Sequence, residues 1–118
     1  MTAREAYITG VGMSEVGVRL KRRPLLLTLD AIREALADAG LAPEQIDGVA
    51  SYPGKMPTYL GFSPVSSDDV IEAFGFKTRW HLGAQEMTAQ LGAISAAAMA
   101  VKAGRASCRS PRGRRALA

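Results

Sequence analysis

The residues with the clearest chemical potential lie in one short turn, Gly83-Ala84-Gln85-Glu86-Met87, directly before a long apolar helix. Small residues at this point leave backbone N–H groups free at the start of the helix, where the helix dipole stabilises negative charge that develops during a reaction. This pattern is suited to acyl chemistry. We therefore expect these five residues to face a substrate.

Three side chains in or beyond this region are of types that take part in catalysis, and Glu86 is the one candidate among them. Glu86 is either a general base, because an apolar surrounding raises the pKa of a carboxyl group, or an acidic residue that the helix dipole favours at an N-terminus. His81 is the single histidine, and within a predicted strand we expect it to be a packed core residue, with Trp80 packing beside it in the core or at a dimer interface. Cys108 lies beyond the helix and is not placed to replace a nucleophile in the turn.

A strand and a helix must hold this turn in place. Thr78–Leu82 is predicted to be the strand, and residues 88–101 the helix. The helix consists almost entirely of Ala, Gly, Ser and medium apolar residues, and a helix that is apolar all round is buried on every side. A chain of 118 residues has little material to surround it. We expect it to leave apolar surface uncovered, so that the isolated chain is poorly soluble or associates.

The segments before this unit predict alternating strands and helices. Ala6–Met13 is expected to be a buried strand that runs into a loop, and Gly48–Ser51 a second short strand. Between them, Leu25–Ala39 is predicted to be a helix, since Leu25, Leu29, Ile32 and Leu36 recur at helical spacing. A strand, a helix and a strand in this order imply a right-handed crossover and a parallel pair.

Helix signals mark both ends of the predicted helices. Pro24 suits a first turn, and Gly40 is placed to end the first helix in the left-handed conformation. Ser66–Gly75 begins with N-cap residues and acids and ends on glycine, which predicts a two-turn helix. The whole order is β-α-β-α-β-α, an α/β chain that begins a three-layer α/β/α unit without finishing it.

Two loops leave functional alternatives open, whereas one glycine pair does not. The basic loop Val18–Arg23 is either a solvated approach to the first helix or a grip on an anionic group such as a coenzyme A phosphate. Tyr52–Ser67, rich in proline and aromatic residues, is either a functional loop or a lid that packs on its own domain. Gly10-Val11-Gly12 is not a dinucleotide motif, because the third glycine of that motif would fall at Glu15.

The excess positive charge is confined to the last fourteen residues. The chain carries a formal net charge of +4, but residues 1–104 hold ten Lys and Arg against eleven Asp and Glu, whereas residues 105–118 hold five Arg and no acid. We divide the chain into a partial domain, 1–104, and a disordered Arg-rich tail, 105–118, without a strand. The tail is either translated in the wrong frame, which we favour, or a basic arm for nucleic acid.

The cysteine count and the hydropathy pattern exclude several classes of protein. Cys108 is the single cysteine, so neither an internal disulfide nor a multi-cysteine zinc site is expected, and a cytoplasmic setting follows as the default. No stretch approaches the length of a membrane-spanning helix, and no signal core follows the first residues. We expect no metal, no bound cofactor and no membrane partner.

Four segments together resemble the N-terminal part of the thiolase superfamily, and within it the sterol-carrier-protein thiolase-like group that includes lipid-transfer-protein aldolases. They are Ala6–Met13, the helix end Ala37–Leu41, the turn Pro43–Val49 and the helix end Ala98–Gly104. The resemblance covers residues 6–104. It implies a fold of two repeated β-α-β-α-β-α-β halves, a dimer, and an acyl-CoA substrate. Coenzyme A then enters as part of the substrate and not as a bound cofactor.

The resemblance also implies a reactive cysteine in the turn before the central helix, whose thiolate attacks the acyl thioester. Met87 stands at that position in this chain. A methionine thioether cannot be acylated, so ordinary thiolysis is not expected. The aldolase branch similarly lacks this cysteine and relies on acid and base residues in its second half, and that branch is therefore favoured.

These observations leave three functional hypotheses. The first is an N-terminal fragment of a thiolase-like acyl-CoA enzyme of lipid or steroid metabolism, an acyltransferase or a retro-aldol lyase, that is inactive alone. The second is a non-catalytic half-domain completed by a partner chain. The third and least favoured is a nucleic-acid binder that uses the basic tail.

Overall fold

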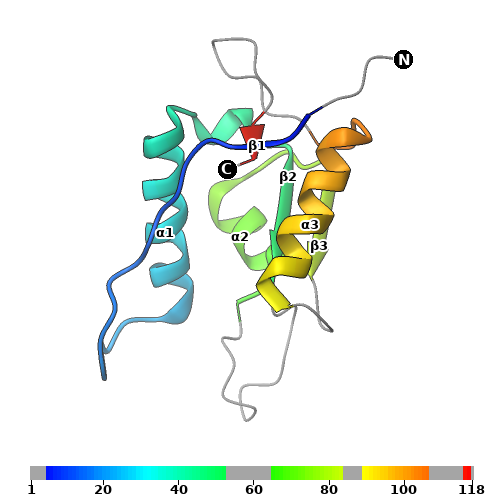
Figure 1. Cartoon of the computed structure of the whole chain (residues 1–118). Coiled ribbons are helices and arrows are strands. Elements are labelled where there is room, and N and C mark those ends of the chain that lie inside the picture. The colour runs from blue at the N-terminus through cyan, green and yellow to red at the C-terminus, as the bar shows by residue number, and fades with distance from the viewer. Residues whose placement is uncertain (1–4, 53–64, 84–88, 107–115, 118) are drawn as a thin grey trace.

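The computed structural model describes residues 5–52, 65–83, 89–106 and 116–117. Helices and short parallel strands alternate along these residues (Figure 1), so the predicted α/β class is confirmed. In chain order the elements are β1 (Tyr7–Ile8), α1 (Pro24–Ala39), the 3-10 helix η1 (Pro43–Gln45), β2 (Gly48–Ser51), α2 (Ser67–Phe74), β3 (Trp80–Gly83), α3 (Ala89–Lys102) and β4 (Ala116–Leu117).

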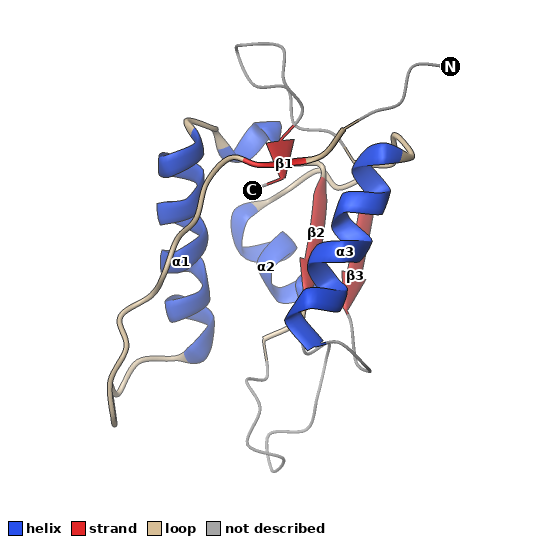
Figure 2. Cartoon of the chain, in the orientation of Figure 1, coloured by secondary structure: helices blue, strands red, loops and turns tan. Residues whose placement is uncertain are grey.

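The strands β2 and β3 form a parallel pair at the centre of the described residues (Figure 2). The register places Gly48 opposite Trp80 and Ser51 opposite Gly83, so the two strands begin and end together. Successive side chains of a strand point to opposite faces. Val49 accordingly packs toward α2, whereas Trp80 packs toward α3. α2 thus lies against one face of the pair and α3 against the other.

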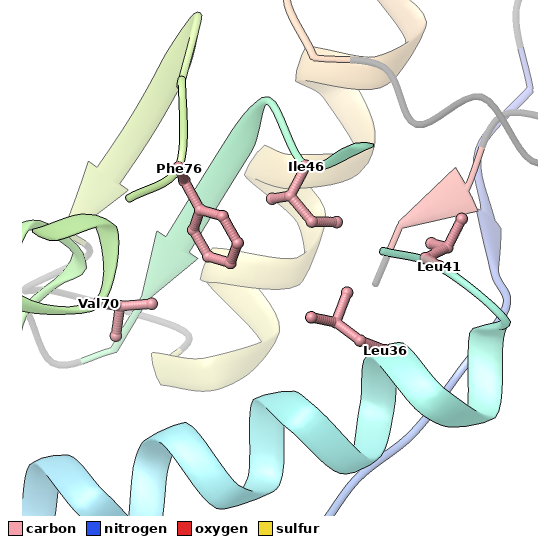
Figure 3. Packing of buried hydrophobic residues seen from close by; sticks show 5 residues of the cluster. All are labelled: Leu36, Leu41, Ile46, Val70 and Phe76. Atoms are coloured by element: carbon pink, nitrogen blue, oxygen red, sulfur yellow. The ribbon is translucent and has the colours of Figure 1, made fainter. Parts of the chain in front are cut away.

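The larger core cluster joins α1, α2 and β2 (Figure 3). Its buried members come from the helices and from the turns that follow them: Leu36, Leu41, Ile46, Val70 and Phe76. The predicted stripe of α1 supplies one wall, since Leu29 and Leu36 are buried and Ile32 packs against the cluster. This cluster fixes α1 and α2 on one side of the sheet.

A second, smaller cluster holds α3 on the other face. Ala100, Val101 and Ala106 are buried there, and Trp80 packs against them. Gly48 allows this packing, because a Cβ at that position would lie 2.7 Å from the Cβ of Ala106. The segment that follows α3 therefore lies close to the start of β2.

The predicted helix ends are confirmed. Pro24 is in the first turn of α1, and Gly40 ends it with a φ of 68°. Ser66 caps α2, since its hydroxyl accepts the Asp69 N–H at 3.4 Å and the Asp69 carboxylate accepts the Ser66 N–H at 2.8 Å. Gly75 ends α2 in the left-handed conformation, with a φ of 67°. These local signals fix both helices without help from distant residues.

The N-terminal strand differs from its prediction. Instead of a buried strand over Ala6–Met13, the structure has the two-residue β1, in which Tyr7 and Ile8 are 45% and 68% exposed. It pairs in parallel with β4 and not with β2, so the predicted pairing across the first crossover is wrong. The prediction of a tail without a strand is also wrong at Ala116–Leu117, because ladder hydrogen bonds need only backbone groups.

The long apolar helix is buried on one side only. Ala93, Ala100 and Val101 of α3 are buried, while three larger side chains are exposed: Leu91 at 69%, Ile94 at 49% and Met99 at 63%. The expectation of burial on every side is therefore wrong within the described residues, and the expectation of uncovered apolar surface is confirmed. The division at residue 104, the three-layer thiolase-like half-domain and poor solubility stay predictions.

No helix within the described ranges has both the length and the apolar character that crossing a membrane requires.

Candidate functional site

The two ends of the central strand pair differ in how they are held. At the amino edge, where β2 and β3 begin, Arg79 joins three elements. Its guanidinium Nη2 donates to the Gly104 carbonyl at 2.6 Å, its Nη1 lies 3.7 Å from an Asp47 carboxylate oxygen, and its backbone N–H donates to the Asp47 carbonyl at 2.7 Å. This edge is closed by polar contacts and by the end of α3.

At the carboxyl edge, β2 ends at Ser51 and β3 ends at Gly83, directly opposite each other. Ligands of open α/β sheets bind outside the carboxyl ends of parallel strands. The first turn of α2 lies near this edge, since Asp68 contacts a residue of β3. α3 starts at Ala89, soon after β3 ends. The carboxyl edge is therefore the candidate functional site.

Ser51 carries a polar atom at this edge that the sequence analysis did not single out. Its hydroxyl oxygen is buried and, among the described residues, has no hydrogen-bond partner. A buried polar atom without a partner costs free energy, and one explanation for such an atom is a further group that binds to it. Its position as the last residue of a predicted strand could have indicated it.

His81 is not a packed core residue as predicted. Its side chain is 52% exposed, and Nδ1 lies 3.8 Å from an Asp68 carboxylate oxygen. The reason is its position beside the first turn of α2, where Asp68 is itself 74% exposed, and not in either core cluster. Trp80 does pack in the core as predicted, against Val101 and Ala106.

Ser51 and His81 lie on the same face of the strand pair, since Val49 stands opposite His81 and two residues before Ser51. A nucleophile requires a base within hydrogen-bond distance. The Ser51 hydroxyl has no such partner in the described part of the chain, so Ser51, His81 and Asp68 do not form a catalytic triad. Within the described residues, this edge offers binding groups and not a nucleophile with its own base.

Most of the predicted site lies outside the described residues. Gly83 is described and is an exposed residue at the carboxyl edge, as a substrate-facing residue should be. Ala84, Gln85, Glu86 and Met87 lie outside the described residues, as does Cys108. Their roles stay predictions. Gly83 does connect the predicted turn to the candidate site.

One cation of the basic loop, Arg22, forms an ion pair within the chain. Arg22 Nη2 lies 2.7 Å from Asp30 Oδ2, and Arg33 lies 3.2 Å from the other oxygen of the same carboxylate. Asp30 belongs to α1, so this contact fixes the loop to the first helix. The grip on a coenzyme A phosphate is not tested by it and stays a prediction.

No group of three or more metal-ligating side chains is found in the ranges that the structure describes. The strand ends supply backbone groups, a hydroxyl and one exposed imidazole. These are groups that bind and orient an organic substrate through hydrogen bonds.

No protein-family model matches the chain. A 17-hydroxy-3-oxo-4-pregnene-20-carboxyl-CoA lyase from Mycobacterium tuberculosis is 30% identical over 104 residues, which are 88% of this chain and 25% of the lyase. The solved structure of an Ltp2-ChsH2(DUF35) aldolase superposes with a TM-score of 0.70 at 29% identity, over 89% of this chain and 25% of that one. The chain is similar to aldolases in sequence and in fold.

The chain spans about a quarter of the length of each of these relatives. The likeness confirms the aldolase side of the predicted resemblance, because one relative is named as a lyase and the other as an aldolase. The wider placement in the thiolase superfamily, the acyltransferase alternative and the dimer stay predictions.

Proposed function

We propose that the chain is the N-terminal part of an aldolase-type enzyme that cleaves or forms a carbon–carbon bond in an acyl-CoA of lipid or steroid metabolism. The observation that carries this proposal is a likeness in both sequence and fold to two such enzymes. The likeness extends over almost nine-tenths of this chain and over a quarter of each relative. We further place it in the thiolase superfamily, with Met87 at the position of the nucleophilic cysteine, and in a homodimer.

The chemistry follows from the substrate for which the mycobacterial lyase is named. A hydroxyl at carbon 17 stands β to a thioester carbonyl attached at carbon 20. In retro-aldol cleavage a base takes the hydroxyl proton, the bond between carbons 17 and 20 breaks, and carbon 17 becomes a ketone. The electron pair passes to the thioester as an enolate, which is then protonated at carbon 20. No nucleophilic residue is needed, in agreement with Met87.

The carboxyl edge of β2 and β3 is the part of this chain that suits such a substrate. Ser51 offers a hydroxyl, Gly83 allows close approach to the backbone, and the start of α3 favours the negative charge of an enolate. We assign the base to the part of the enzyme beyond this chain, because the aldolase branch that the chain resembles relies on acid and base residues in its second half. The chain alone is then inactive.

A chimera tests this proposal. Residues 6–104 replace the matching quarter of the mycobacterial lyase, and release of the carbon-17 ketone from the pregnene carboxyl-CoA is measured beside the parent lyase and the 118-residue chain. We expect the chimera to turn over and the isolated chain to show no activity. A chimera with native-like circular dichroism but without turnover would contradict the proposal, as would robust activity of the isolated chain.

A second candidate function is a half-domain that a separate partner chain completes. Two observations favour it: Leu91, Ile94 and Met99 expose an apolar face of α3, and the name of the similar aldolase joins Ltp2 to ChsH2(DUF35). An apolar face of this kind is typical of an interface.

Mixing distinguishes the two candidates. The remaining three-quarters of the mycobacterial lyase is added as a separate polypeptide, and association is measured by sedimentation. The second candidate predicts a stable complex that is lost with Leu91→Asp and Met99→Asp but kept with Lys102→Asp, an exposed change on the same helix. If the chimera is active and no complex forms, the first candidate stands alone.

A further inference from the structure

The basic loop Val18–Arg23 presents positive charge that the described part of the chain does not neutralise. One of its four cations is paired, since Arg22 Nη2 lies 2.7 Å from Asp30 Oδ2. The other three are exposed and enter none of the ion pairs among the described residues: Arg19, Lys21 and Arg23. The sequence has no acid from residue 16 to residue 29. The loop is therefore a surface that suits an anion.

The backbone of the loop holds two of these cations in a defined turn. Arg19 and Lys21 are both in the left-handed conformation, with φ of 56° and 52°. This conformation is costly for residues other than glycine, and residues held in it occur often where a protein binds a ligand. Leu20, between them, is partly buried and lies close to Gly17, where a Cβ would be 2.9 Å from Leu20 Cδ2. The turn thus packs one residue and exposes a cation on each side of it.

The basic loop lies at the same end of the molecule as the candidate site. α1 and α3 both begin at the end where β2 and β3 finish (Figure 1). The loop directly precedes Pro24, the first residue of α1. α1 has no acid in its first turn, whereas α2 has Asp68 and Asp69 there, so the dipole of α1 adds to the positive potential of the loop. The positive charge is therefore at the carboxyl edge of the strand pair.

We propose that Arg19, Lys21 and Arg23 bind the phosphate groups of the coenzyme A part of the substrate. This inference rests on the proposed function, in which the substrate is an acyl-CoA. Coenzyme A carries a diphosphate and a 3′-phosphate, and guanidinium and ammonium groups bind phosphates through charged hydrogen bonds. Its pantetheine arm separates these phosphates from the thioester. Residues that hold the phosphates are therefore expected near the reacting end of the strands but outside it, where the basic loop lies.

Arg22 has a different role from the three unpaired cations. Its contact with Asp30 ties the loop to α1, and Arg33 holds the other oxygen of the same carboxylate. A loop that is fixed before a ligand arrives loses less conformational entropy on binding. Arg22 is thus a positioning residue for the phosphate site and not a ligand-binding one.

An anionic membrane surface is the other partner that suits a basic loop. Val18 is 90% exposed, which favours insertion into a membrane. Segments that bind anionic lipids carry clusters of about four to eight Lys or Arg residues. This loop has only the three cations that are not already paired. The count favours a single molecule that bears phosphates.

Binding of coenzyme A to the full 118-residue chain tests the inference without turnover. Equilibrium dialysis compares Lys21→Glu with Lys77→Glu, which makes the same change of charge at an exposed lysine before β3, at the amino edge. We expect Lys21→Glu to weaken binding about tenfold and Lys77→Glu to leave it within about twofold of wild type. Equal affinities of the two variants, or no binding by the wild-type chain, overturn the inference.

Two further probes identify what the loop binds. Pantetheine, which has no phosphate, should bind the chain at least tenfold more weakly than coenzyme A, and equal affinities contradict a phosphate site. Vesicles that contain phosphatidylserine are tested by sedimentation. If Lys21→Glu reduces binding to vesicles and not to coenzyme A, the partner is a membrane and the inference is wrong.

The chimera with the mycobacterial lyase separates this inference from the proposed function. There kcat and KM are measured for the acyl-CoA and for the matching acyl-pantetheine thioester. We expect Lys21→Glu to raise KM about tenfold for the acyl-CoA alone, with kcat unchanged, and Lys77→Glu to change neither. Turnover with equal KM values in the two variants supports the proposed function and overturns the inference. A folded chimera without turnover contradicts the proposed function, while coenzyme A binding that depends on Lys21 still supports the inference.

Discussion

The amino and carboxyl edges of the central strand pair are built from the same two strands and serve different ends. At the amino edge, Arg79 binds the end of α3 and the carboxylate before β2, and Trp80 is packed against Val101. At the carboxyl edge, the Ser51 hydroxyl lacks a partner in the described residues and His81 is half exposed. Packing and polar contacts are concentrated at the amino edge, and an unpartnered hydroxyl and a half-exposed imidazole lie at the carboxyl edge.

This difference separates the residues that stabilise the fold from the residues that are available to bind a ligand. Sites for ligands need groups that the protein itself has not already paired, and such groups reduce stability. The three substitutions below are ordered by their expected effect on the free energy of unfolding, from the largest to the smallest. Two of them lie at the amino edge and one at the carboxyl edge, so their effects compare the two edges.

Trp80→Ala at the amino edge should have the largest effect. The ring packs against the cluster of Ala100, Val101 and Ala106, so its loss leaves a cavity and should reduce the free energy of unfolding by about 3 kcal/mol. Urea denaturation measures this loss. Trp80→Phe should retain more than half of the stability lost in the alanine variant. A loss below about 1 kcal/mol in the alanine variant would show that the amino edge does not contribute most to stability.

Arg79→Gln should have an intermediate effect. It removes the charged hydrogen bond to the Gly104 carbonyl and the contact with Asp47, at a cost of about 1–2 kcal/mol, reduced by the partial exposure of the side chain. Lys77→Gln, an exposed change close by, is the matched control and should lie within about 0.5 kcal/mol of wild type. Equal effects of the two changes would show that the contacts of Arg79 do not stabilise the amino edge.

His81→Asn at the carboxyl edge should have the smallest effect. The imidazole and the Asp68 carboxylate are 3.8 Å apart and both exposed, so the pair is expected to contribute less than about 0.5 kcal/mol. Urea denaturation at two salt concentrations measures it. A loss as large as that of Arg79→Gln would mean that the carboxyl edge also carries stability.

The helices were predictable from sequence because their signals are local. Pro24 and Gly40 bound α1, and Ser66 and Gly75 bound α2, in agreement with the structure. Each of these residues acts on its own turn of backbone. The position of β2 was predictable for a similar reason, since Gly48–Ser51 is delivered by a tight turn.

The neighbour of β1 and the exposure of His81 were not predictable in this way. Strand alternation identifies Tyr7–Ile8 as extended but does not say which edge it joins, and the close approach of Gly10 to α1 depends on three-dimensional packing. His81 has the apolar neighbours of a core residue in sequence, while its exposure depends on which turn of α2 lies beside it in space. In the candidate site, Ser51 was missed, and the substrate-facing role of Gly83 stays a prediction.

One measurement tests most directly whether the carboxyl edge is the functional edge. In the chimera with the mycobacterial lyase, kcat/KM for retro-aldol cleavage is compared between Gly83→Val, at the end of β3, and Lys77→Val, before its start. We expect at least a tenfold fall for Gly83→Val with unchanged stability, because the added side chain occupies the space of the substrate, and no fall for Lys77→Val. Equal kcat/KM values in the two variants would contradict the account.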